Sequence, residues 1–338
     1  MGMTRGWLGL AAAAVGMAGG VLAGGCTVNP TTGRSQFAAL SRSQEISLGT
    51  QAKPELTKQF GGAVSDPQLA GYVTEIGQKL ARVTETDNPG LPWEFTLLNS
   101  EVINAFALPG GKVFISRGLA DRMTSEAQLA GVLGHEIGHV TARHTSERIG
   151  QATIAQVLVA GAAIGVSAAV KDEVVAEGAV VGLTVGGQLV TLKFSRDQES
   201  EADALGMRYM AKVGYDPRGQ LEVMQILKEA SGGGGGGATS EMFATHPLPE
   251  TRIARVSELL RTTFANTQNN PAYRKGEAEF RRRYLRRSAM LPPPPDREAV
   301  RAAMLELGNP ATWCAHCAEA AAGGRPVAVG EIGPDWLW

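Results

Sequence analysis

The sequence has few cysteines, few aromatic residues and almost no net charge. Cysteine occurs 3 times in 338 residues, aromatic residues make up 6% of the chain, and 32 lysine and arginine residues face 33 aspartate and glutamate residues. The near-neutral balance gives no reason to expect nucleic acid as a partner. Hydrophobic residues make up 43% of the chain, which is typical of a globular protein with one sizeable core or two modest domains.

The few cysteines divide into one near the amino terminus and a pair in the segment TWCAHCAEA. In an exported protein, Cys314 and Cys317 predict a disulfide. Haem attachment would need a histidine directly after the second cysteine, where the chain has Ala318. Two cysteines with His316 make only a weak metal site.

An apolar segment opens the sequence and ends at Cys26. Residues 1–25 carry one arginine and then a run rich in alanine and glycine. This pattern predicts a secretory signal, and its final cysteine resembles that of a bacterial lipoprotein. Ala23 stands where such signals usually carry a branched apolar residue, so plain secretion is the alternative. Lipidation of Cys26 would anchor the chain to a membrane. Thr27 favours the outer membrane, on the periplasmic face of a bacterial cell envelope.

Hydrophobic spacing predicts helices with a few short strands between them. A polar stretch at 27–36 is expected to link the amino terminus to the first helix. The expected helices are 41–60, the segment after the capping residue Asp66, 194–214, 219–230, 245–260 and the basic segment 280–287; the expected strands are 93–100, 101–108 and 112–116.

A further helix is predicted to begin at Ser125, which forms a capping-box pattern with Gln128. Its expected buried stripe is Leu129, Val132, Leu133, Ile137 and Val140. The charged residues of 143–148 are expected to mark its emergence into water.

Residues 152–170 form a run of nineteen residues without a charge. This length is borderline for a membrane span. A single crossing would separate the histidines at 135–139 from the acidic helix at 194–214, and the return segment 179–192 is too short to cross. We therefore expect buried or surface-lying apolar helices near the site.

Two histidines and a glutamate lie within the sequence GHEIGH of the helix that begins at Ser125. His135 and His139 are about 40° apart around the helix axis, so their imidazoles point from one face and can share one zinc ion. Glu136, about 100° away, can take a proton from water that zinc activates and return it to the leaving amine. This is the His-Glu-x-x-His arrangement of zinc peptidases. The alternative is a chance grouping of polar residues in a helix.

A catalytic zinc ion needs a third protein ligand and an open fourth position. His144 lies about 140° from His139 around a continuous helix and is expected to face elsewhere. Metzincins have a glycine and a histidine where this chain has Ala142 and Thr145, which excludes that class.

The acidic segment DQESEAD offers the missing ligand. Glu199 and Asp203 are four residues apart and share a helix face, whereas Glu201 points away. The spacing predicts Glu199 as the third ligand and Asp203 as hydrogen-bond acceptor for the far nitrogen of a ligand histidine. A solvated, acidic helix end is the alternative.

Five segments, in order, resemble the HtpX-like peptidase family, which also contains the CAAX prenyl proteases. They are NPTTGRSQ, NAFALPGGKVFISRGL, GHEIGHVTARH, SRDQESEAD and THPLPETR, within roughly residues 29–262. The resemblance implies that His135, His139 and Glu199 bind zinc and that Glu136 is the catalytic base.

The same resemblance implies roles for residues outside these two helices. His246 would lie near the zinc ion, where it either assists catalysis or fills the open position; capping a helix is its alternative role. Arg252 would pair with the acidic helix or stabilise the oxyanion. Asn104, Ala105, Phe106 and Ala107 resemble the edge strand along which an extended substrate lies.

The sequence therefore predicts an α+β, mostly helical fold of the gluzincin type, with a small sheet beside the zinc-binding helix. The expected divisions are a lipoprotein signal at 1–25, a peptidase domain at 26–265 and an extension at 266–338 with a basic helix, a proline-rich linker and a CxxC tail. The predicted function is an endopeptidase with one zinc ion per chain that cleaves unfolded or misassembled cell-envelope proteins. A chaperone-like or scaffold lipoprotein with a structural or closed zinc site is the alternative, and binding of 280–287 to anionic lipid is a third.

Overall fold

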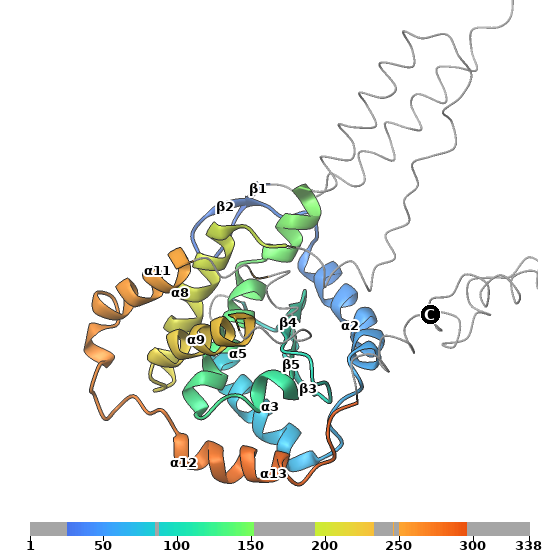
Figure 1. Ribbon diagram of the computed structural model, residues 1–338. Coiled ribbons are helices and arrows are strands. Elements are labelled where there is room, and N and C mark those ends of the chain that lie inside the picture. Colours follow the sequence, from blue (N-terminus) through green and yellow to red (C-terminus); the bar gives the residue numbers. More distant parts are fainter. Residues whose placement is uncertain (1–25, 85–87, 152–192, 233–245, 247–249, 296–338) are drawn as a thin grey trace, which may run out of the picture.

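The computed structural model of the protein describes residues 26–84, 88–151, 193–232, 246 and 250–295 (Figure 1). This part of the chain is mostly helical with two small sheets, which confirms the α+β class. Its helices include α2 (Arg42–Gln59), α3 (Pro67–Arg82), α4 (Arg117–Ala120), α5 (Glu126–Thr141), α8 (Arg196–Lys212), α9 (Arg218–Gly232), α11 (Glu250–Arg261), α12 (Glu277–Phe280) and α13 (Arg286–Ser288), with the 3-10 turn η1 (Ala265–Thr267) and the π-helical turn η2 (Arg281–Leu285).

Three strands form the sheet beside α5. They are β3 (Glu94–Leu98), β4 (Ala105–Leu108) and β5 (Lys112–Ser116), in the order β3-β5-β4, with β3 parallel and β4 antiparallel to β5. The side chains of Phe106 and Phe114 stack with ring centroids 4.6 Å apart in a cluster with α2. Ala105 and Ile115 belong instead to the main core with α5. The strand expected at 101–108 begins only at Ala105, because the loop before it packs against α4, where a Cβ on Gly118 would lie 2.0 Å from the Glu101 carbonyl oxygen.

Helix α5 is buried along its whole length, so the predicted apolar stripe is correct but understates its burial. Ser125 caps the helix by accepting from the Gln128 N–H. The capping box is incomplete, because the Gln128 side chain accepts from the Thr124 N–H at 2.7 Å. A helix enclosed on every side lies at the centre of the fold.

Helices α5 and α8 pack with their backbones almost in contact. A Cβ on Gly138 would lie 2.9 Å from the carbonyl oxygen of Ala202, and a Cβ on Gly206 would lie 2.8 Å from the backbone nitrogen of His135. Any larger residue would separate the helices. The glycines therefore set the distance between the histidines of α5 and the carboxylates of α8.

The polar stretch expected to be a linker is a small hairpin packed on the domain. Its strands β1 (Cys26–Val28) and β2 (Ser35–Phe37) pair antiparallel, with Cys26 opposite Phe37. In the turn, the buried Asn29 donates to the carbonyl of Thr141 at 3.0 Å. Local sequence indicated only polarity, whereas the hairpin depends on contacts with residues more than 100 positions away.

The basic segment of the expected extension packs into the same core. Phe280 and Tyr284 are fully buried and stack with centroids 4.9 Å apart. Arg283 pairs with Glu75, and Arg287 pairs with Asp66, the N-cap residue of α3. Through residue 295 this segment therefore lies against the peptidase core, and two of its arginines are held by acidic residues of α3 and its cap.

Several expectations concern residues outside the described part of the chain. These are the signal at 1–25, the apolar segments 152–170 and 179–192, and the pair Cys314 and Cys317. Among the described helices, none combines the length and the apolar character that a membrane crossing requires.

Candidate metal centre

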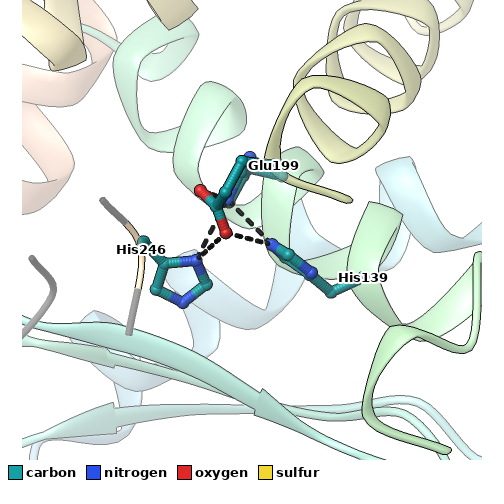
Figure 2. Close-up of side chains that lie close together, drawn as sticks. His139, Glu199 and His246 are labelled. Carbon is teal, nitrogen blue, oxygen red and sulfur yellow. Dashed lines mark hydrogen bonds and ion pairs between the residues drawn. The ribbon is translucent and has the colours of Figure 1, made fainter. Parts of the chain in front are cut away.

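Three imidazoles and one carboxylate converge between α5 and α8. Figure 2 labels three residues of this group, His139, Glu199 and His246. His135 and His139 come from α5, Glu199 comes from the first turns of α8, and His246 lies on the segment before α11. A complete capping box between Ser195 and Gln198 fixes the start of α8 just before Glu199. All four metal-facing residues are buried, with Glu199 0% exposed.

The donor atoms of these residues lie within 4.8 Å of one another. The Nε2 atoms of His135 and His139 are 3.1 Å apart, and the Glu199 carboxylate lies 3.5 Å from the first and 3.3 Å from the second. The Nδ1 atom of His246 lies 2.9 Å from Glu199. Two histidines and a glutamate match the donor set of catalytic zinc sites, and a fourth donor closes a tetrahedron. The residues therefore fit a zinc ion.

Glu136 lies beside this set and is not part of it. Its Oε1 atom is buried 3.8 Å from the Nε2 atom of His246 and has no hydrogen-bond partner within the described ranges. Burial raises the pKa of Glu136. A buried carboxylate with a free oxygen and a raised pKa is suited to taking up a proton.

The far side of His135 is held by charged residues. Its Nδ1 atom lies 2.9 Å from the Asp203 carboxylate. Arg252 donates to both oxygens of Asp203, at 2.9 and 2.7 Å, and also pairs with Glu199. Burial would raise the pKa of Asp203, but the Arg252 charge and the contact with His135 lower it overall.

The far side of His139 contacts His144, a residue expected to face elsewhere. Helix α5 ends at Thr141, and Arg143 adopts a left-handed conformation with φ 60°, so the angle around a continuous helix does not apply. Residues 144–151 are helical again, and the His144 Nδ1 atom lies 2.9 Å from the His139 Nδ1 atom. His144 is therefore behind a candidate ligand and outside the ligand group.

The expected emergence of 143–148 into water is also wrong. His144 is 0% exposed and Ser146 1% exposed, because the amino-terminal segment covers this turn. The Leu40 N–H donates to the Ser146 hydroxyl at 3.0 Å. Glu201 does point away from the ligand group, and it meets the Nε2 atom of His144 at 2.9 Å.

Sequence reasoning also missed Phe194. Its ring lies 4.1 Å from the ring of His139 and 5.2 Å from that of His246, between centroids, and the residue is 9% exposed. An aromatic residue just before a capping serine carries no signal for such a role. Phe194 shields the two imidazoles on one side.

The expected substrate strand lies at the edge of the sheet. Within the ranges described, β4 pairs only with β5, so its other edge is unpaired. Asn104 is 3% exposed, and its side-chain oxygen lacks a hydrogen-bond partner among the described residues. Phe106 points into the cluster under α2, whereas Ala105 and Ala107 contact the main core. Bonded pairs alternate along an antiparallel ladder, and the Ser116 N–H donates to the Asn104 carbonyl, so β5 uses the main chain of Phe106. The main chains of Ala105 and Ala107 face the free edge.

A buried cluster of two α5 histidines and an α8 glutamate, with a free glutamate beside it, defines a metallopeptidase of the His-Glu-x-x-His class. The model of peptidase family M48 matches residues 67–260, and the chain belongs to this family. The expected family resemblance is thereby confirmed, and with it the class of metallopeptidase.

The chain is similar to curated relatives of two kinds. It is 30% identical over 246 residues to the beta-barrel assembly-enhancing protease of Escherichia coli (strain K12), covering 72% of this chain and 50% of the relative. It is 32% identical over 238 residues to the putative beta-barrel assembly-enhancing protease of Vibrio cholerae, covering 69% and 47%. It is 29% identical over 261 residues to the mitochondrial metalloendopeptidase OMA1 of Saccharomyces cerevisiae, covering 71% and 73%. The chain thus spans about half the length of the bacterial relatives.

Proposed function

We propose that the protein is a zinc-dependent endopeptidase of the bacterial cell envelope that cleaves unfolded or misassembled envelope proteins. The observation that carries this proposal is the grouping of His135, His139 and Glu199 with the carboxylate of Glu136 beside them. When bound, one zinc ion supplies Lewis acidity and makes water acidic enough to act as a nucleophile near neutral pH.

Each residue of the group has a distinct task in this proposal. His135, His139 and Glu199 hold the ion. Glu136 accepts the proton of the attacking water and passes it to the leaving amine, for which its buried site and raised pKa are favourable. Asp203 orients His135, and Arg252 neutralises the excess negative charge of Glu199 and Asp203. With both carboxylates as its partners, Arg252 is better suited to this pairing than to an oxyanion.

The free edge of β4 is the proposed substrate site. An extended peptide that adds to this edge is bound through its main chain, so the preference for substrate sequence should be weak. The unpartnered side-chain oxygen of Asn104 can accept from a substrate N–H. Folded proteins seldom offer a free extended segment, and this favours unfolded or misassembled substrates.

The location of this activity is proposed from the amino terminus. A lipid on Cys26 would anchor the domain to the outer membrane on its periplasmic face. The names of the bacterial relatives link them to β-barrel assembly, and we propose envelope proteins as substrates for this chain on that basis. The match covers about half of each of those relatives, so we propose for this chain no partner that their other half binds.

A second function is favoured by His246. Its Nδ1 atom lies with the other three donors, and four protein ligands are typical of structural zinc sites. In this state the protein would be a chaperone-like or scaffold lipoprotein. The same contact would make His246 a plug in the position that water or substrate needs.

Substitution of Glu136 and His246 separates these functions. Glu136→Gln should retain zinc, measured by elemental analysis, and lose at least about a thousandfold in cleavage of denatured casein. His246→Ala should retain zinc and cleave at least as fast as the wild type if His246 is a plug. Undiminished cleavage by Glu136→Gln would contradict the proposal, and no cleavage by zinc-loaded wild type and His246→Ala would favour the scaffold.

A further inference from the structure

A chain of hydrogen bonds leads from the rear of His139 to the amino-terminal hairpin. The Nδ1 atoms of His139 and His144 are 2.9 Å apart, and the Nε2 atom of His144 lies 2.9 Å from Glu201. Arg34 then lies 3.3 Å from the same oxygen of Glu201 and donates to both oxygens of Glu147 at 2.9 Å. The chain crosses three segments that are distant in sequence.

The carboxylate of Glu201 determines which nitrogen donates in the hydrogen bonds of His144 and His139. An ionised glutamate can only accept hydrogen bonds, so the Nε2 atom of His144 must carry the proton that reaches Glu201. A neutral His144 then has a lone pair on Nδ1 and accepts from the Nδ1–H of His139. His139 is left with its lone pair on Nε2, the atom that faces Glu199 and the other ligands. The carboxylate of Glu201 thus selects the tautomer in which His139 can bind a metal.

We infer that His144 and Glu201 are positioning residues that fix the tautomer and orientation of His139 for metal binding. This inference rests on the metal site of the proposed function and adds two residues to it. Ligand histidines commonly donate their second N–H to a carboxylate or carbonyl, and loss of that partner typically lowers metal affinity about 10–100-fold. Here a second imidazole stands between the ligand and the carboxylate.

Exposure decreases from the outer end of the chain to the inner end. The side chains of Arg34, Glu201 and His144 are 39%, 25% and 0% exposed. Arg34 and Glu201 line a cavity of about 710 Å³ together with Glu147 and Asp197. Water can therefore replace part of the outer contacts, whereas nothing replaces His144 in its closed position. The effect of substitution should be larger at His144 than at Glu201.

Zinc affinity of the full-length protein in detergent, measured by competition with a chromogenic chelator, tests the inference. His144→Phe should weaken zinc binding about 10–100-fold and Glu201→Ala about 10-fold. Glu201→Gln should restore most of the loss, because its amide oxygen still accepts from His144. Asp197→Asn is the matched control on α8, because Asp197 lines the same cavity and is not part of the chain of hydrogen bonds. Its zinc affinity should stay within about twofold of the wild type.

A spectroscopic measurement keeps the inference falsifiable if His144→Phe fails to fold. In zinc-loaded wild type with ¹⁵N-labelled histidine, NMR should show His144 protonated on Nε2 and a scalar coupling between the two Nδ1 nuclei across their hydrogen bond. Protonation of His144 on Nδ1, or zinc affinity of Glu201→Ala within about twofold of the wild type, would overturn the inference.

These outcomes differ from failure of the proposed function. If the wild type binds one zinc ion tightly and both variants match it, only the roles of His144 and Glu201 are wrong. If the wild type binds no zinc, both the proposed function and the inference fail.

Discussion

The two histidines of α5 lie one helical turn apart, yet the residues behind them differ in charge and in exposure. Behind His135 are Asp203 and Arg252, whose side chains are 2% and 6% exposed. The partner behind His139 is a second imidazole, that of His144. The first charged side chain on this side is Glu201, which lies farther out, where water has access. The pKa of His135 is shifted down by burial and up, by more, through Asp203 and Glu199, to about 10, whereas burial holds the pKa of His139 well below its usual range.

This difference separates two ways of supporting a metal ligand. The Asp203 side supplies negative charge that strengthens His135 as a donor, and it depends on Arg252 to balance that charge in a dry site. On the other side, His144 orients the ring of His139 and places little charge next to it. Two histidines that occupy equivalent places in one sequence motif should therefore respond differently to substitution and to pH.

Removal of the buried guanidinium should have the largest effect. Arg252→Met leaves Glu199 and Asp203 without their counter-charge, and loss of one partner of a buried ion pair costs about 3–5 kcal/mol. Urea unfolding of the metal-free protein measures this loss. Arg261→Met on the same helix removes an arginine that is 72% exposed and should change stability by less than about 0.5 kcal/mol. A similar, small effect of both substitutions would remove the distinction between a charged and an uncharged side.

Acid should reduce the contribution of Asp203. Its folded pKa is depressed, so the stability it adds is fully present above its unfolded pKa of about 4 and is lost as pH falls through the folded value. Asp203→Asn should destabilise the metal-free protein by about 2 kcal/mol at pH 7, and this difference should shrink below about pH 4.

Glu147 provides the comparison on the other side. Its hydrogen bond with Arg34 lowers its pKa, so the stability that Glu147 adds should also be lost as the pH falls. Because Arg34 is more exposed than Arg252, Glu147→Gln should destabilise the protein less than Asp203→Asn at every pH. Urea unfolding at pH 7, 5, 4 and 3.5 measures both series. A difference for Asp203→Asn that grows on acidification would contradict the assignment.

Removal of the outer arginine should have the smallest effect. Arg34 is 39% exposed, so Arg34→Ala should cost less than about 1 kcal/mol even though it breaks pairs with Glu147 and Glu201. The loss should shrink further when salt is raised from 50 to 500 mM, because exposed charges are screened. A loss above 2 kcal/mol that salt leaves unchanged would show that the His139 side depends on charge as the His135 side does.

The centre of the site could be predicted because it depends on local spacing. The separations of His135 from His139 and of Glu199 from Asp203 each fix a helix face, and the capping residues Asp66 and Ser125 marked two helix starts correctly. Only the pairing of α5 with α8 needed information from outside each segment: the need of a catalytic zinc ion for a third ligand suggested it, and the resemblance to a family supported it.

The rear of His139 could not be predicted because α5 stops at Thr141, between His139 and His144. The left-handed residue Arg143 is stabilised by distant partners: it donates to Glu45 at 2.9 Å and to the carbonyl of Leu40. An arginine in this conformation gives no local warning, since glycine is the residue that usually adopts it. The packing of Phe280 and Tyr284 into the core escaped prediction for a similar reason, because the surrounding arginines hide two buried aromatic residues four positions apart.

Strand β1 begins at Cys26 and pairs immediately with Phe37. A flexible tether of n residues lets a domain explore about 5–6 Å × √n, and a lipid on Cys26 would leave no such tether. The peptidase would then lie against the bilayer. Its active site would reach proteins close to the membrane surface and would not reach those that diffuse farther away.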